Sequence, residues 1–347
     1  MLLSVIIPTL HRIESLMRQL RSLQAQTLPQ FEIVVVDNAA DAILMSRLAV
    51  FNQTACHPVH YVPEPRRGLM EARHAGAHCA KGDVLVYVDD DQTTAPGALE
   101  AYAHAFATYS EMAAAGGPVG LAWEAPPPQW LLDYMQPTPT MFPLLGFLDL
   151  GQEFTLDPRG ILFGGNLAIR RTVLFQIGGF NPELVGTRCV GDGEVGLYHK
   201  LWEQGLLIGY VPEAKQVQYL PPHRMTVAYL RQRVAHDGAS DMYTVYHPGI
   251  PSRWRLVQHA AHIAVQNAKY WLGGLPFYGR TDPWSINVQL RAARTRAQGA
   301  YLLRLCYDRD LRQLVRATNW LEAFAPASAP TPRPIEEEER AKVRKVS

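Results

Sequence analysis

Short apolar runs, two of which lead into acidic residues, limit the folds open to this chain. Ser4–Ile7, Ile33–Val36 and Val84–Val88 are rich in β-branched residues, and the second and third run into Asp37 and Asp89–Asp91. Helical stretches separate these runs, and this alternation predicts an α/β fold with a mostly parallel central sheet flanked by helices. Because such sheets bind ligands at the carboxyl ends of their strands, the acidic positions predict a site at that edge.

The helical stretches are recognised by the spacing of their apolar residues. Leu16, Leu20 and Leu23 recur at helical spacing, so this segment is expected to lay one apolar face on the sheet. Further helices are expected over 42–52, over 68–80 and, after a loop, within 191–205.

A proline-rich stretch follows a strand predicted at Val119–Trp123. Residues 126–143 contain several prolines together with Trp130, Tyr134 and Phe142. Because proline lacks a backbone donor and interrupts regular elements, this stretch is predicted to form neither a helix nor a strand. Its aromatic content predicts an ordered loop that covers part of the molecule.

The overall charge and the cysteines exclude some classes of protein. The 347 residues carry 33 Lys and Arg against 32 Asp and Glu, a net charge of +1. The chain therefore lacks the bulk positive charge typical of nucleic-acid binders. Its four cysteines are far apart and form no Cys-x-x-Cys pair, as expected of reduced thiols in a cytoplasmic protein. No window reaches the roughly 18 to 20 apolar residues of a membrane-spanning helix.

The last third of the chain differs in character, which predicts an α/β domain over 1–230, a helical region over 231–325 and a disordered tail over 326–347. Residues 253–324 hold eleven Lys or Arg and four Asp or Glu, about +7 in net charge. The tryptophans of this part are expected in the core. Its two apolar stripes at helical spacing are Val257, Ala261, Ala264, Ala268 and Trp271, and Ile286, Leu290, Ala293, Ala297 and Tyr301.

Three roles stay open for these basic helices. They could lie against an anionic membrane at its inner face and present a lipid-linked acceptor, cap the α/β domain, or join copies of the chain into a homo-oligomer.

Asp89–Asp91 is a candidate for chemistry in its own right. Adjacent carboxylates repel one another unless a cation neutralises them, and Mg²⁺ is typically held by one or two carboxylates together with substrate phosphates. The triplet therefore predicts a metal and diphosphate site. Taken alone, it is at least as typical of a solvated acidic turn at the end of a strand.

Several motifs, in order along the chain, resemble one enzyme family. They are SVIIPT, VVVDN, GLMEARHAGAHCAKGD leading into YVDDD, GGNLAIRR and GDGEVGLYHKLWEQG. In this order and spacing, over residues 1–225, the chain resembles the family 2 glycosyltransferases. The resemblance implies the A-type, Rossmann-like nucleotide-sugar fold and a transferase of polysaccharide biosynthesis. It also implies transfer of a hexose, with inversion, from a nucleotide-diphosphate donor such as a UDP- or GDP-sugar.

The resemblance further implies roles for individual residues. Asp89 and Asp91 match an Asp-X-Asp motif that holds Mn²⁺ or Mg²⁺ on the diphosphate, with Asp89 facing the ribose. Gly165 and Asn166 match a strand that borders the sugar and the acceptor. The nucleotide-binding positions are matched by Pro8, Thr9, Asp37, Arg73, Asp89 and Asp90.

The catalytic base falls in a segment that departs from the family pattern. Relatives usually have Gly-Glu-Asp before the helix, whereas this chain has Asp192-Gly193-Glu194. An ungapped alignment back from Leu201 places Glu194 at the base position and leaves Asp192 as the rival.

A second departure concerns the metal. Many relatives have a metal-binding histidine after the last strand, where this chain has Gln218 and Tyr219. Either His223 takes that place, or Asp91, phosphates and water hold the ion.

The chemistry accounts for these residue types. A sugar diphosphate leaves readily once a divalent cation neutralises its growing charge, and an acceptor hydroxyl needs a carboxylate to take its proton. One base opposite one leaving group gives a single displacement with inversion. Two alternatives stay open: a nucleotide-sugar-binding protein without catalysis, and a nucleotidyltransferase, although the loop at 8–12 lacks the glycine-rich signature usual for the latter.

Overall fold

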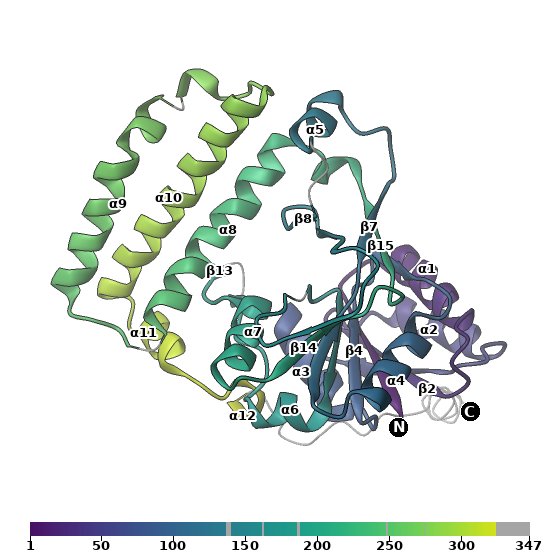
Figure 1. Cartoon of the computed structure of the whole chain (residues 1–347). Coiled ribbons are helices and arrows are strands. Elements are labelled where there is room, and N and C mark those ends of the chain that lie inside the picture. The colour runs from purple at the N-terminus through teal and green to yellow at the C-terminus, as the bar shows by residue number, and fades with distance from the viewer. Residues whose placement is uncertain (137–139, 162, 186–187, 248, 274, 324–347) are drawn as a thin grey trace, which may run out of the picture.

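The computed structural model describes residues 1–136, 140–161, 163–185, 188–247, 249–273 and 275–323 (Figure 1). Within them an eight-stranded, mostly parallel sheet lies at the centre of the first two thirds of the chain. Its strand order is β10 (Thr155–Asp157), β14 (Leu207–Tyr210), β6 (Met112–Gly116), β11 (Asn166–Arg170), β4 (Val84–Val88), β1 (Leu3–Thr9), β2 (Phe31–Asp37) and β3 (Val59–Pro63).

The neighbours β4, β1, β2 and β3 run parallel, as do β6 and β14, whereas β11 is antiparallel to both β4 and β6. The predicted strands at Ser4–Ile7, Ile33–Val36 and Val84–Val88 are thus confirmed as β1, β2 and β4. The α/β fold class is confirmed with them.

Helices cover both faces of this sheet, because successive strand residues point to opposite sides. In β1, Val5 and Ile7 pack with α1 (Ile13–Gln24), α2 (Ala42–Asn52) and α4 (Ala98–Thr108). Ile6 faces the other way and packs with α3 (Leu69–Cys79), α6 (Arg171–Gln176) and α7 (Gly193–Glu203).

Smaller elements extend the domain. A five-stranded sheet has the order β5 (Gln92–Thr94), β15 (Gln216–Leu220), β7 (Val119–Trp123), β9 (Phe147–Leu148) and β8 (Met141–Phe142). A two-stranded sheet pairs β12 (Leu184–Val185) with β13 (Arg188–Cys189).

The expectation that 126–143 holds no regular element is wrong. Helix α5 spans Gln129–Tyr134, and β8 also lies in this stretch. The prolines flank the helix instead of interrupting it: Pro128 stands at the N-cap with extended backbone, where proline costs no hydrogen bond. Leu131 is fully buried and anchors α5 to the apolar cluster beneath.

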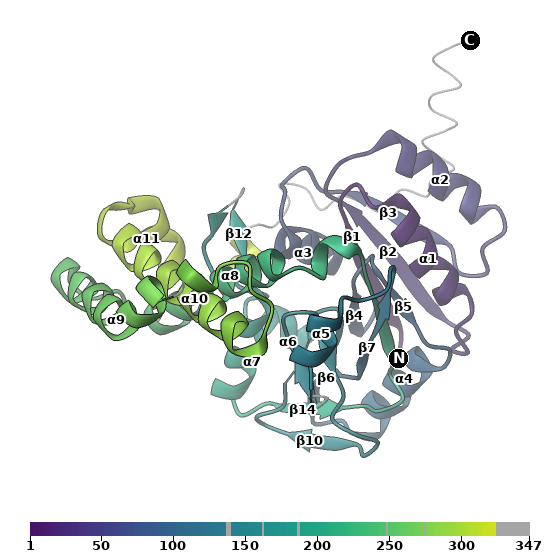
Figure 2. The ribbon, with the colours of Figure 1, turned by 90° about the horizontal axis from the view of Figure 1, so that it is seen from above.

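Helices form the rest of the described chain. Figures 1 and 2 show α10 between α8 and α9 in an arm that projects from the sheet domain. These elements are η1 (Pro222–Arg224), α8 (Val227–Tyr246), α9 (Arg253–Gly273), η2 (Leu275–Phe277), α10 (Pro283–Tyr307), α11 (Arg309–Arg316) and α12 (Trp320–Ala323). The predicted boundary at 230 falls inside α8, and the predicted tail lies outside the described residues. None of the described helices combines the length and the apolar character that crossing a bilayer requires.

The arm differs from the sequence expectation in what it buries. Ile286, Leu290 and Tyr301 of the second stripe are buried as expected, but Val257 of the first stripe is exposed. Trp254 and Trp284 are also exposed, so the expectation of core tryptophans is wrong for these two, although Trp320 is buried. For Val257 and Trp254 the reason is that, among the described residues, α9 packs on α10 and η2 and contacts α8 through Tyr246 and His259, all on one side, which leaves the opposite side of α9 uncovered.

Candidate active site

Acidic residues gather at the carboxyl ends of β4, β1 and β2, which are adjacent and parallel. Thr9 pairs with Asp37 across β1 and β2, and its hydroxyl donates a hydrogen bond of 2.8 Å to Asp90. The side chains predicted from separate motifs therefore lie along one edge of the sheet. We call Asp37, Asp89, Asp90, Asp91 and Glu194 the acidic rim.

Two arginines neutralise the central part of the acidic rim. Arg12, from the loop after β1, donates to Asp90 at 3.1 Å and to Asp91 at 3.0 Å. Arg224, from η1, approaches Asp91 from another part of the chain at 2.9 Å. Burial raises the pKa of Asp90 to about 6 in spite of Arg12 and the Thr9 hydroxyl. Two cationic groups thus lie directly beside the carboxylates of Asp90 and Asp91.

A buried arginine joins the two ends of the site. Arg73 of α3 has no exposed side-chain surface, and it donates to Glu194 at 2.8 Å and to Asp89 at 3.3 Å. Both carboxylates keep about a third of their side-chain surface exposed, 32% each. Burial raises the pKa of Glu194, but the Arg73 charge and the hydrogen bonds from Arg73 and the Gly164 N–H outweigh it and lower the pKa overall. Glu194 is therefore an ionised carboxylate at neutral pH.

Two glycines allow the chain to approach these carboxylates closely. A Cβ atom on Gly164 would lie 2.2 Å from the Glu194 carboxyl and 2.5 Å from Arg73. A Cβ atom on Gly165 would lie 2.6 Å from an Asp89 oxygen. The entrance to β11 therefore leaves no room for a side chain at either position, and only Gly165 was singled out from the sequence.

Asp192, the rival to Glu194, is committed to the fold. It is buried, accepts 2.8 Å hydrogen bonds from Asn181 and from Thr244 of α8, and stands at the N-cap of α7. Burial raises its pKa. These contacts tie α7 to the arm, whereas Glu194, two residues further along the chain, faces Arg73 and Asp89, which favours Glu194 as the base.

Two other predicted residues also bond within the fold. Asp37 accepts from the backbone N–H groups of Ala39 and Asp41 and from the Tyr61 hydroxyl. Asn166 is fully buried, and its amide bonds the Tyr102 hydroxyl and two backbone carbonyls. Pro8 is buried in β1. Contacts of these three with a nucleotide or a sugar stay predictions.

The donor set of the acidic rim suits a hard divalent cation that keeps its waters. Asp89 and Asp91 supply two carboxylates at one rim, which is the number Mg²⁺ typically takes beside phosphates. Across the described residues, no group of three or more His, Cys, Asp or Glu side chains could hold a metal. His223 is exposed, and its ring meets the Tyr229 ring edge-on. Its neighbour Arg224, not His223, contacts Asp91.

Arg12 and Arg224 are the site residues that sequence reasoning missed. Arg12 carries a weak signal, because a basic residue in the loop after the first strand faces the same edge as the acidic triplet. Arg224 carries none, since η1 is brought to Asp91 only by the pairing of β15 with β5 and β7.

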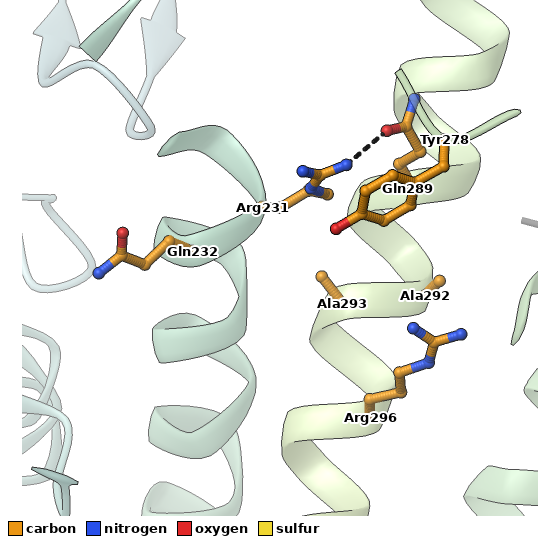
Figure 3. Close-up of a pocket in the computed structure, with 7 residues that line it drawn as sticks. All are labelled: Arg231, Gln232, Tyr278, Gln289, Ala292, Ala293 and Arg296. Atoms are coloured by element: carbon orange, nitrogen blue, oxygen red, sulfur yellow. Dashed lines mark hydrogen bonds between the residues drawn. The ribbon is translucent and has the colours of Figure 1, made fainter. Parts of the chain in front are cut away.

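A separate cavity lies in the arm. It measures about 190 Å³ and lies between α8 and α10, as Figure 3 shows. Arg231 there bonds Gln289 at 2.9 Å and stacks on Tyr278. No acidic residue lines it, so it is distinct from the acidic rim. The lining residues are Arg231, Gln232, Tyr278, Gln289, Ala292, Ala293 and Arg296.

The fold and the acidic rim define a class, the sugar-transferring enzymes of the A-type fold. More particularly, the model of the family described as "Glycosyl transferase family 2" matches residues 4–178, about half of the chain. This chain belongs to glycosyl transferase family 2.

The chain is also similar, at lower sequence identity, to individual proteins. The chain is 26% identical over 245 residues to a glucosyl-dolichyl phosphate glucuronosyltransferase of Haloferax volcanii, covering 69% of this chain and 76% of that protein. It is similar to GalNAc-T7 solved with UDP, GalNAc and Mn²⁺, at 21% identity and a TM-score of 0.47, covering 63% of this chain and 43% of the other. It is also similar to residues 1–349 of S. aureus TarS solved with UDP-GlcNAc, at 17% identity and a TM-score of 0.46, covering 68% and 66%.

Proposed function

We propose that this chain is an inverting glycosyltransferase that moves a hexose from a UDP- or GDP-sugar to an acceptor hydroxyl with the help of Mn²⁺ or Mg²⁺. The observation that carries the proposal is the bridge Glu194–Arg73–Asp89. Through Arg73, it holds the ionised carboxylate of Glu194 in the same site as Asp89, the first residue of the acidic triplet. Membership of the family supports the reaction class.

Glu194 takes the proton of the acceptor hydroxyl as the hydroxyl attacks the anomeric carbon. Its oxygens each accept one hydrogen bond from the protein, from Arg73 and from the Gly164 N–H, and each keeps a free lone pair. The two bonds hold the carboxylate in one orientation. One base on one side of the sugar gives one displacement, and hence inversion.

The departing diphosphate would be bound by Arg12 and Arg224, which both contact Asp91. Asp90, which also accepts a hydrogen bond from Thr9, fixes Arg12. A divalent cation held by Asp89 and Asp91 would act as a Lewis acid on the diphosphate oxygens. Because Asp91 already bonds two guanidinium groups, its charge is shared between them and the ion.

The acceptor is proposed to be linked to a lipid phosphate, and the chain to work at the inner face of a membrane. The Haloferax relative is named as an enzyme acting on glucosyl-dolichyl phosphate, and this name supports a lipid-phosphate acceptor. The positive charge of the arm supports it as well. The donor sugar is left to experiment.

The test is a transfer assay with a panel of UDP- and GDP-sugars and a polyprenyl-phosphate-linked acceptor. We expect one donor to release its nucleoside diphosphate with Mn²⁺ or Mg²⁺ present, and NMR of the product to show inverted anomeric configuration. The midpoint temperature of thermal unfolding should rise in the presence of that donor, since a ligand at a hundred times its Kd stabilises the folded protein by about 2.7 kcal/mol. Retained configuration would overturn the single displacement, and turnover unchanged in EDTA would overturn the metal.

A further inference from the structure

Helix α9 is apolar on two opposite sides, although only one side has a neighbour. Leu256, Ala260 and Ile263 are buried and belong to the apolar cluster shared with α8 and α10. In Figures 1 and 2, α9 is the outermost helix of the arm and lies on the far side of α10 from α8, which it meets through the Tyr246 hydroxyl and the His259 ring. The side of α9 that faces away from α10 is therefore open among the described residues.

That open side carries a continuous apolar stripe. Trp254 is 68% exposed, Val265 is 77% exposed and Leu272 is 74% exposed. At 3.6 residues per turn, these positions fall on one line along the helix, together with exposed Ala261. We call Trp254, Ala261, Val265 and Leu272 the α9 outer stripe. Apolar residues scattered singly need no explanation, but a stripe along a whole helix marks an interaction surface.

The charge around the α9 outer stripe selects the partner. Arg253–Gly273 contains Arg253, Arg255 and Lys269 and no Asp or Glu. A second copy of the same helix would bring like charges together, which disfavours self-association through this face. A surface with negative charge and an apolar interior complements both features of the helix.

Aromatic residues point to the same kind of surface. Tyr278 and Trp284 lie where the chain passes from the end of α9 to the start of α10, and they are 63% and 61% exposed. The indole of Trp284 packs edge-on against the ring of Phe277. Trp and Tyr favour the boundary between lipid headgroups and acyl chains. We infer that the α9 outer stripe lies in the headgroup region of an anionic lipid bilayer, with Arg253, Arg255 and Lys269 of the same helix on the lipid phosphates.

This inference deepens the membrane location proposed above, but its test needs neither donor nor acceptor. The full chain is mixed with vesicles of phosphatidylcholine alone or with phosphatidylglycerol added, and bound protein is measured by co-sedimentation. We expect binding only to the anionic vesicles, weakened by salt. Val265→Glu should weaken it about tenfold or more, and each of Arg255→Gln and Lys269→Gln about fivefold.

The matched control is Val50→Glu, which places the same change on α2 at a valine that is 65% exposed and should bind like the wild type. Thermal unfolding of both glutamate variants checks that the fold is intact. No binding of the wild type to anionic vesicles at low salt would overturn the inference, as would equal binding by Val265→Glu. A third outcome would also overturn it: the wild type sediments as a dimer, Val265→Glu sediments as a monomer, and neither binds vesicles. A second copy of the chain would then cover the stripe. A failure here leaves the transfer assay untouched.

Discussion

The acidic rim and the α9 outer stripe use charge in opposite ways. In the rim, the carboxylates are wholly or partly buried and each contacts a named partner, as Glu194 and Asp89 do with Arg73. On α9, the side chains of Trp254, Val265 and Leu272 face outward and stay 68%, 77% and 74% exposed within the part of the chain that the structure describes. The first arrangement fixes atoms within hydrogen-bond distance, as a reaction requires. The second tolerates small displacements, as a surface contact does.

The largest expected effect tests the rim. Glu194→Gln removes the base but keeps an oxygen for the Gly164 N–H, so transfer should fall by about 10² to 10⁴, while donor affinity changes little. Steady-state kinetics and calorimetry with the donor measure the two quantities.

Asp192→Asn is the matched control two residues away. It perturbs the bonds to Asn181 and Thr244, so it should lower stability and keep most of the transfer rate. If Asp192→Asn lost more activity than Glu194→Gln, the assignment of the base would be reversed. A chain that transfers no sugar even as wild type would instead be a binding protein.

The next largest effect, on nucleoside diphosphate binding, distinguishes the arginines that contact the acidic rim from an arginine at the cavity in the arm. Arg12→Ala and Arg224→Ala should each weaken nucleoside diphosphate binding by about tenfold or more, since a hydrogen bond to a charged group contributes about 1.5–3 kcal/mol. Arg231→Ala, at the cavity between α8 and α10, should leave that affinity unchanged. Calorimetric titration with UDP and GDP measures it, and equal affinity for Arg224→Ala and wild type would remove Arg224 from the diphosphate site.

A third prediction concerns how the arm is packed. A Cβ atom on Gly238 of α8 would lie 2.4 Å from the Arg294 carbonyl oxygen of α10, so Gly238→Ala should destabilise the protein by about 1–3 kcal/mol. Gly299 of α10 has no atom within 4 Å of such a Cβ, so Gly299→Ala should stabilise by about 0.5–1 kcal/mol. Urea unfolding measures both, and destabilisation by Gly299→Ala would show that α10 is crowded there as well.

Much of the sheet domain could be predicted because its signals are local. Apolar runs mark the buried strands, and parallel strands must bring Asp37 and Asp89–Asp91 to one edge. The resemblance to the family, aligned back from Leu201, singled out Glu194, and the structure brings it to Arg73 and Asp89; its role as the base stays a prediction.

What could not be predicted depends on contacts between distant segments. Thr244, which holds Asp192, lies in α8 and meets α7 only in the folded chain. Arg224 reaches Asp91 through strand pairing. The exposed Trp254 has the spacing of a core residue, and only the position of α9 at the edge of the arm reveals that none of the described residues buries it. Likewise, composition alone does not show that the prolines before α5 stand at its N-cap and so permit the helix.

The last prediction is a dependence of stability on pH, and it again separates buried from exposed groups. His74 of α3 is buried, and its Nε2 accepts a 2.9 Å hydrogen bond from the Phe180 N–H. Burial, with a smaller contribution from Lys200, lowers its pKa to about 3, against about 6.5 in the unfolded chain. Between these values the unfolded chain binds more protons, so this stabilisation is complete above pH 6.5 and is lost as the pH falls.

At pH 5 the loss from His74 should reach about 2 kcal/mol relative to pH 7. His74→Gln offers Phe180 an amide oxygen that does not titrate, so its free energy of unfolding should fall less over this range than that of the wild type. His262→Gln, on the exposed part of α9, should follow the wild type because water solvates that ring in both states. Urea unfolding at pH 7 and pH 5 measures the three proteins. Parallel curves for wild type and His74→Gln would mean that the ring accepts a proton in the folded state, and that the bond from Phe180 is not what holds α3 against the loop at 178–181.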